Sequence, residues 1–155
     1  MDDAALRRAI EGFLAGHHVV TLATVGGDGA PHATSLLYAT RGLALVWTSK
    51  PCTRHSTHLA SAPRVSATVA PDTADFAAIR GVRIVGTARR LDDPAEAAAG
   101  RAALEARYPT LAGEGAPAGV REAWAKAAIY QLDPVAFTWI DNAAGFGAQR
   151  ELRVS

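Results

Sequence analysis

The segment from Trp47 to Ser56 gathers side chains of the kind that bind phosphate. It reads Trp-Thr-Ser-Lys-Pro-Cys-Thr-Arg-His-Ser. Thr53 suits the N-cap of a short helix, whose first-turn N–H groups carry a partial positive charge. Hydroxyl groups add neutral donors, and Arg54 can hold two phosphate oxygens at once. The segment therefore predicts a phosphate-binding cradle, and the alternative is that Thr53 only caps the helix while Arg54 and Lys50 are solvated.

Histidine and cysteine side chains raise two other possibilities, a metal site and a catalytic thiol. His55 and His58 are three residues apart on the same predicted helix, and the remaining histidines are His17, His18 and His32. A metal at this spacing needs carboxylate ligands as well, and the helix holds none, so we expect no metal site. Cys52 lies beside basic residues, which makes a reactive thiol worth considering, but no orienting acid is identifiable, so we expect no catalytic role for it.

Aromatic residues and a C-terminal arginine are candidates for contact with a ring-shaped ligand. Trp47, Trp139 and Phe146 could stack on an aromatic cofactor, although aromatics at strand ends usually complete a core. Arg150 lies in a polar, glycine-flanked tail. It gains little by folding back unless it meets an anion or a carboxylate such as Glu151, and the alternative is a frayed, solvated terminus.

Length and composition limit what can position these residues. With 155 residues, 49% of them apolar and 20% charged, the chain (1–155) is expected to form one domain with a real core. A formal charge of +1 gives no global attraction for nucleic acid or for an anionic membrane. One cysteine excludes an internal disulfide, and no apolar run reaches the roughly 20 residues that span a bilayer. The start Met-Asp-Asp fits no signal peptide, so we expect a cytoplasmic protein.

The hydrophobic pattern predicts a mainly β fold with peripheral helices. We expect strands at residues 18–25, 31–40, 43–48, 65–70, 82–91, 129–132 and 136–140, and helices at 2–15, 54–62, 94–108 and 120–126. The strand at 43–48 alternates poorly, as expected for one covered on both faces, and the tail from residue 141 is glycine-rich and polar. Six to seven antiparallel strands with short turns favour a closed barrel. Side chains fill a barrel of this size, so a ligand would lie outside it or between two subunits.

The order of these pieces resembles the pyridoxamine 5′-phosphate oxidase-like FMN-binding split-barrel family, and within it a small branch with a C-terminal Gly-Phe-Gly-x-x-Arg-Glu tail. The resemblance covers nearly the whole chain. The segments that carry it are Thr24-Val25, Pro31-His32-Ala33-Thr34-Ser35-Leu36, Thr53-Arg54-His55, Ala62-Pro63-Arg64-Val65, residues 79–86 (Ile-Arg-Gly-Val-Arg-Ile-Val-Gly) and residues 141–151.

This resemblance implies a homodimer of split barrels that holds two FMN molecules in the clefts between its subunits. It places a strand beside the flavin ring, a second strand end at the ribityl and phosphate groups, and the start of the short helix on the phosphate. Basic residues would approach from the partner subunit, and the 145–150 tail would cover the ring. The cofactor-binding residues implied are Ala33, Thr34, Ser35, Leu36, Trp47, Thr48, Ser49, Thr53, Arg54, His55, Arg80, Arg83 and Arg150.

The resemblance also implies a function, with departures. Where many members carry Arg-Lys at the phosphate, this chain has Arg54-His55, which weakens the charge at pH 7. The family's namesake enzyme needs a set of basic residues for its phosphorylated substrate, and that set is not identified in this sequence, so we do not expect pyridoxamine phosphate oxidation. We expect a small FMN-dependent oxidoreductase that passes hydride from a donor such as NADH or NADPH to a small-molecule substrate. The alternatives are a non-catalytic flavin-binding or flavin-sensing protein, and a relative that uses deazaflavin (F420) or haem.

Overall fold

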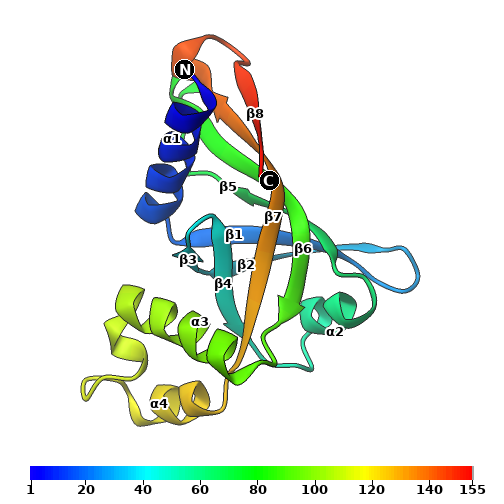
Figure 1. Cartoon of the computed structure of the whole chain (residues 1–155), viewed down its shortest axis with the longest axis vertical. Coiled ribbons are helices and arrows are strands. Elements are labelled where there is room, and N and C mark those ends of the chain that lie inside the picture. The colour runs from blue at the N-terminus through cyan, green and yellow to red at the C-terminus, as the bar shows by residue number, and fades with distance from the viewer. Residues whose placement is uncertain (155) are drawn as a thin grey trace.

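The computed structural model describes residues 1–154, whose eight strands form one antiparallel sheet flanked by helices (Figure 1). The strands are β1 (Val19–Val25), β2 (Pro31–Leu37), β3 (Ala39–Arg41), β4 (Ala44–Ser49), β5 (Arg64–Val69), β6 (Arg80–Arg90), β7 (Ala128–Asp141) and β8 (Gln149–Arg153). The helices are α1 (Asp3–Gly16), α2 (Arg54–Ser61), α3 (Pro94–Arg107) and α4 (Ala118–Ala125), with 3-10 turns η1 (Phe76–Ala78), η2 (Pro109–Leu111) and η3 (Asn142–Ala144). The predicted fold class, a mainly β split barrel with peripheral helices, is confirmed.

The barrel closes at a bend between two consecutive strands. Hydrogen bonding orders the strands β2-β1-β5-β6-β7-β4-β3, with β8 added to β7. β2 and β3 therefore stand at opposite ends of this order, although only Tyr38 separates them in the chain. The sheet curls until its two end strands are two halves of one bent segment. The single strand predicted at 31–40 is thus divided, because each half pairs with a different neighbour.

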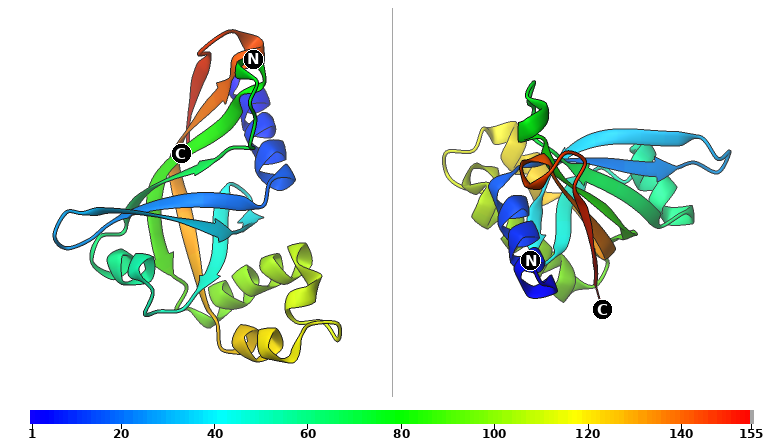
Figure 2. Two further views of the ribbon diagram at one scale, coloured as in Figure 1. Left: turned by 180° about the vertical axis from the view of Figure 1, so that it is seen from behind. Right: turned by 90° about the horizontal axis from the view of Figure 1, so that it is seen from above.

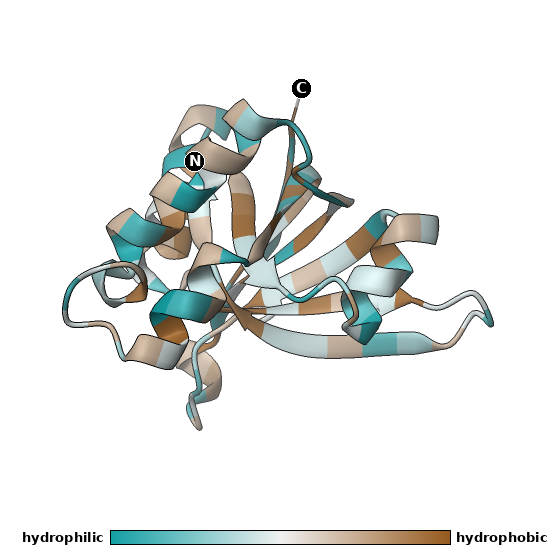
Figure 3. Ribbon diagram, turned by 90° about the horizontal axis from the view of Figure 1, so that it is seen from below, coloured by the Kyte–Doolittle hydropathy of each residue, from teal (hydrophilic) through white to brown (hydrophobic). Residues whose placement is uncertain are grey.

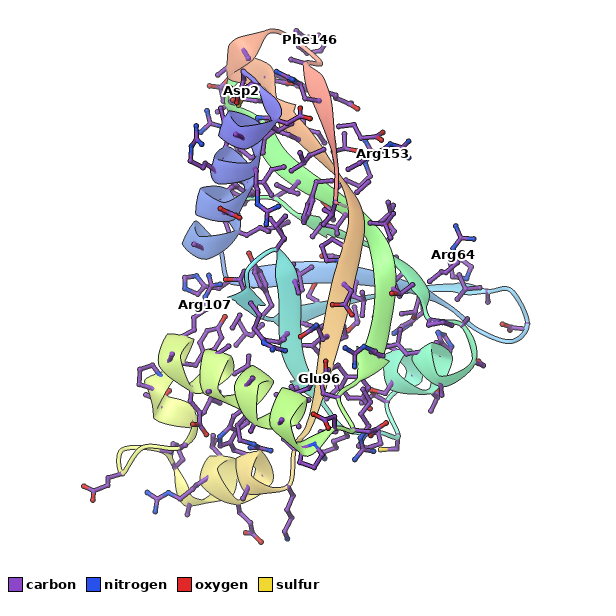
Figure 4. The ribbon with its side chains drawn as sticks, in the orientation of Figure 1. Asp2, Arg64, Glu96, Arg107, Phe146 and Arg153 are labelled. Atoms are coloured by element: carbon purple, nitrogen blue, oxygen red, sulfur yellow. The ribbon has the colours of Figure 1, made fainter. Side chains whose placement is uncertain are left out.

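Tyr38 turns inward at this bend and fixes it. Its side chain is fully buried, and its hydroxyl donates to the carbonyl of Leu14 at 2.7 Å. Its backbone N–H donates to the carbonyl of His18 at 3.1 Å. From α3, Arg107 points toward the end of α1 and donates to the carbonyls of Leu14 and Ala15 (Figure 4). These bonds satisfy carbonyls that the end of α1 leaves free, so they join α1 and α3 to the bend.

β7 is one continuous strand. The sequence predicts two strands, at 129–132 and 136–140, separated at Pro134, since proline has no N–H to offer the ladder. The structure shows that β7 runs through Pro134, opposite a register shift at Gly86 of β6. Such a bulge leaves one residue outside the ladder. Only glycine fits there, because a Cβ on Gly86 would lie 2.2 Å from the carbonyl oxygen of Asp133.

Two hydrophobic clusters lie on either side of the barrel wall. Apolar and polar segments alternate along the strands (Figure 3). In β4, Leu45 and Trp47 point into the main core, which α1 closes at one end, whereas Val46 points into a smaller cluster under α3 and α4. The prediction that this strand is covered on both faces is confirmed.

The glycine-rich tail is an added strand. Gly145 and Gly147 have positive φ angles, which allow the chain to reverse after η3. β8 then pairs with β7 along Ala136–Ile140 and buries Leu152. The sequence signal for this strand is weak because Leu152 is its one buried residue.

The β1–β2 hairpin projects beyond the barrel, with α2 beside it (Figure 2). Gly29, at φ +80°, supports the turn between the two strands, which was predicted at 26–29. Within residues 1–154, no helix is both long enough and apolar enough to cross a bilayer.

Replacing Gly86 by alanine is expected to destabilise the protein by about 3 kcal/mol or to prevent folding, because the new methyl group would overlap the backbone of β7. The measurement is the urea midpoint. Gly12→Ala is the control: Gly12 lies within α1 with nothing within 4 Å of the added carbon, so stability should rise by about 0.5 kcal/mol. Equal midpoints for the two variants would contradict the account of the bulge.

Candidate functional site

Hydroxyl groups and one arginine surround the point where β4 ends and α2 begins. We call Ser49, Thr53, Arg54, His55 and Ser56 the cradle. Ser49 Oγ lies 2.7 Å from His55 Nε2, and Thr53 Oγ1 lies 2.7 Å from Ser56 Oγ and 3.2 Å from His55 Nε2. The predicted grouping of these side chains is therefore present within a single chain.

Thr53 occupies the N-cap position of α2, as predicted, but its side chain does not cap the helix. Its hydroxyl lies 3.0 Å from the carbonyl oxygen of Lys50 and is engaged there and with Ser56. The first helical hydrogen bond runs from Thr57 N–H to the Thr53 carbonyl. The N–H groups of the first turn are thus left without a side-chain cap in the described chain, and such groups attract anions.

Two polar contacts and one apolar contact hold α2 on the barrel. Leu59 is buried in the main core. His58 Nδ1 lies 2.9 Å from Thr24 Oγ1 of β1, and His55 reaches Ser49 of β4 as described above. Because these contacts reach two different strands, the orientation of the first turn of α2 is fixed.

Three histidines meet beside the cradle. The rings of His32 and His55 are parallel, with centroids 6.4 Å apart, and the rings of His32 and His58 are perpendicular at 5.8 Å. We call these three residues the histidine cluster. Burial lowers the pKa of His55, and the neighbouring imidazoles of His32 and His58 lower it further. His55 is therefore neutral at pH 7, and Arg54 supplies the positive charge of the cradle.

His32 was absent from the predicted site. The signal for it was the hairpin register: once Val25 pairs with Pro31, Thr24 must face His32 across the strands. Because Thr24 also contacts His58, this pairing brings β2 to the helix.

A polar pocket of about 340 Å³ opens between the hairpin and α2. Its lining residues are Asp28, Ala30, Pro31, His32, Arg54 and His58. Arg54 is exposed, and its guanidinium forms no ion pair within residues 1–154. An uncommitted arginine next to open helix amides can bind an anion such as a phosphate group.

The other predicted cofactor contacts on β2 and β4 differ in exposure. Ala33 and Ser35 are exposed on β2, whereas Thr34 and Leu36 are half-buried. Trp47 is fully buried and stacks on Tyr130 in the main core, so its indole adds no surface to the site. The hydroxyl of Thr48 donates to the carbonyl of Ala128 at 3.0 Å.

The predicted arginines of β6 and the tail lie together but away from the cradle. Arg80 pairs with Asp141 at 3.3 Å, and Arg83 donates to Gln149 at 3.4 Å. Arg150 donates to the carbonyl of Met1. All three lie at the β8 end of the β6–β7 ladder, whereas α2 leads into the opposite end of β5. Within one chain, these three arginines therefore do not reach the cradle. Phe146, between η3 and β8, is 87% exposed (Figure 4).

Comparison with known proteins gives one family and a set of shared folds. The family model described as pyridoxamine 5′-phosphate oxidase matches residues 6–138. No curated protein matches the sequence. A conserved hypothetical protein from Mycobacterium tuberculosis is 23% identical, with a TM-score of 0.71 over 91% of this chain and 85% of that one.

Two further solved structures of this fold are described as haem proteins. A heme binding protein from Mycobacterium smegmatis is 25% identical with a TM-score of 0.72, and the match covers 99% of this chain and 58% of that one. The heme storage protein HutZ from Vibrio cholerae is 17% identical with a TM-score of 0.65, over 82% of this chain and 88% of that one.

The pKa of His55 makes stability depend on pH in a defined direction. In the unfolded chain His55 titrates near the ordinary histidine pKa of 6.5, and in the folded chain its pKa is lower. Below pH 6.5 the unfolded state therefore binds more protons, so the free energy of unfolding falls as the pH drops from 7 to 5. His55→Gln should reduce this slope in urea unfolding experiments.

His18→Gln is the matched control, because His18 is exposed and lies outside the histidine cluster. This variant should keep the wild-type slope. An unchanged slope in His55→Gln would show that His55 does not bear the burial cost assigned to it.

Proposed function

Because the chain belongs to the pyridoxamine 5′-phosphate oxidase family, we propose that it is an FMN-binding flavoprotein acting as a small oxidoreductase. The observation that carries this proposal is the cradle. Three hydroxyl groups come together at the first turn of α2, which has no side-chain cap, and Arg54 of the same turn forms no ion pair within residues 1–154. A phosphate monoester such as that of FMN needs several donors and at least one cation, and this donor set matches it.

Each part of the cradle has a distinct task in this proposal. Arg54 binds two phosphate oxygens and balances part of the charge. The hydroxyl of Ser49 would donate to a phosphate oxygen while it keeps His55 as its other partner, and the hydroxyl of Thr53 would turn from the Lys50 carbonyl to the phosphate. Neutral His55 positions Ser49. When bound, FMN supplies hydride exchange, while the chain binds and orients it.

A second copy of the chain completes the proposed site. Val19 and Leu37 face each other across β1 and β2 and are 50% and 58% exposed. Paired exposed apolar side chains on a sheet mark a surface suited to association. Since Arg80, Arg83 and Arg150 cannot reach the cradle of their own chain, we propose that a homodimer brings them to the cradle of the partner.

Arg54→Ala should raise the Kd for FMN by about 30-fold, equivalent to about 2 kcal/mol, while the fold stays intact. Arg64→Ala is the matched control. Arg64 is exposed at the start of β5 and points away from the barrel (Figure 4). Fluorescence titration of FMN measures both variants. A wild-type Kd in Arg54→Ala, or an equal loss in Arg64→Ala, would refute the assignment of the cradle.

Catalysis is a separate part of the proposal. No side chain of the cradle is placed as a general acid or base, which agrees with chemistry centred on the cofactor. We expect the protein to oxidise NADH or NADPH only when FMN is present. Tight FMN binding without turnover of either donor would instead identify a flavin-binding protein that is not an enzyme.

Haem is the second candidate, and the histidine cluster favours it. His32 and His58 line the polar pocket, and imidazole is a common axial ligand of haem iron. Relatives of the same fold include a heme binding protein and a heme storage protein. We rank FMN first because the cradle supplies donors for a phosphate, a group that haem lacks.

A further inference from the structure

A second and larger cavity lies next to the cradle, between α4 and the ends of β4 and β7. Its volume is about 630 Å³, within the range of pockets that hold small organic ligands. Figure 1 shows α4 below these strand ends. Its apolar lining includes Pro51, Leu111, Val120, Ala123, Trp124 and Ala127. We call it the apolar pocket.

Side-chain contacts hold the wall of the apolar pocket in place. Trp124 is 5% exposed, and its indole N–H donates to Glu105 at 2.7 Å. The Arg101 guanidinium lies 4.5 Å from the centre of the Trp124 ring and donates to the carbonyls of Trp124 and Ala127. A wall held by contacts on its far side does not need to be ordered when a ligand binds, which lowers the entropic cost of binding.

The charge at the pocket is positive. The sequence contains two lysines, Lys50 and Lys126, and both line this cavity. They come from different segments: Lys50 follows β4, and Lys126 follows α4. No carboxylate is among the residues that line the pocket. Lys126 lies 3.6 Å from Glu122, but both side chains are more than 70% exposed, and such a pair contributes little.

We propose that the apolar pocket binds a small amphipathic carboxylate. The apolar body of the ligand would lie against Trp124 and Val120, the latter 41% exposed at present. Its carboxylate would lie between the two lysines. Ser49 links this site to the cradle, since it lines the pocket and also contacts His55. The proposal does not depend on which cofactor the cradle holds.

The test is isothermal titration of the full chain, in its native assembly, with 4-phenylbutyrate. The neutral analogue 4-phenyl-1-butanol has the same apolar body without the charge. We expect the carboxylate to bind at one site per chain and about tenfold more tightly than the alcohol, because two cations contribute. If the carboxylate shows no saturable binding, the proposal is overturned. This also holds if binding fails because a second copy of the chain covers the pocket. Equal affinity for the alcohol would overturn the role of the lysines.

Substitutions locate the site. Lys50→Gln and Lys126→Gln should each weaken carboxylate binding by about threefold, as expected for partly exposed ion pairs. Arg8→Gln, which removes one positive charge from the exposed face of α1, should leave it unchanged. Ala123→Trp fills the pocket from an exposed position and should abolish binding.

Circular dichroism and FMN retention are measured in parallel on the same variants. A folded Ala123→Trp protein that still binds the carboxylate would place the ligand elsewhere. A uniform loss in all lysine and arginine variants would show attraction by net charge and refute the site.

Discussion

Tyr38 holds the barrel closed at the bend between β2 and β3. Burial raises the pKa of Tyr38 to about 12, so its hydroxyl stays protonated and donates to the end of α1. The Tyr108 hydroxyl donates to the Tyr38 carbonyl at 2.6 Å, and the Arg107 guanidinium lies 5.0 Å from the centre of the Tyr38 ring. Because one bent segment pairs with both β1 and β4, the hairpin and the end of β4 are held in fixed relation to each other. The cradle and the histidine cluster lie between these two parts.

The hydroxyl groups of the cradle already have hydrogen-bond partners within it. Ser49, Thr53 and Ser56 hydrogen-bond within the cradle, and His55 is neutral because it is buried beside two other imidazoles. An incoming phosphate can accept from the Ser49 hydroxyl while His55 keeps its contact with the same oxygen, so that no buried polar atom loses its partner. Two pockets of different chemistry therefore lie near the cradle. The polar pocket is lined by Arg54, and the apolar pocket is lined by residues 49–51 and has Lys50 and Lys126 at its wall.

Local patterns in the sequence were sufficient to predict the barrel and the grouping of the cradle residues. They did not predict contacts between residues that are distant in the sequence. Alternating apolar residues and short turns predict the antiparallel strands, and the run of hydroxyl and basic residues around Thr53 predicts a cluster of these side chains at the start of α2. The continuity of β7 through Pro134 depends on a glycine 48 positions earlier, at Gly86. The position of His32 depends on hairpin register, and β8 depends on one buried leucine, Leu152. Predicting such features requires knowing which strand each segment pairs with.

The visible absorption spectrum of the purified protein tests whether the chain binds FMN, which the assignment of the cradle to the FMN phosphate requires. The spectrum is recorded as isolated, and again after incubation with FMN and desalting. We expect a retained flavin spectrum at about one equivalent per chain. A colourless protein after desalting would contradict it, and a Soret band in place of flavin bands would assign the histidine cluster to haem.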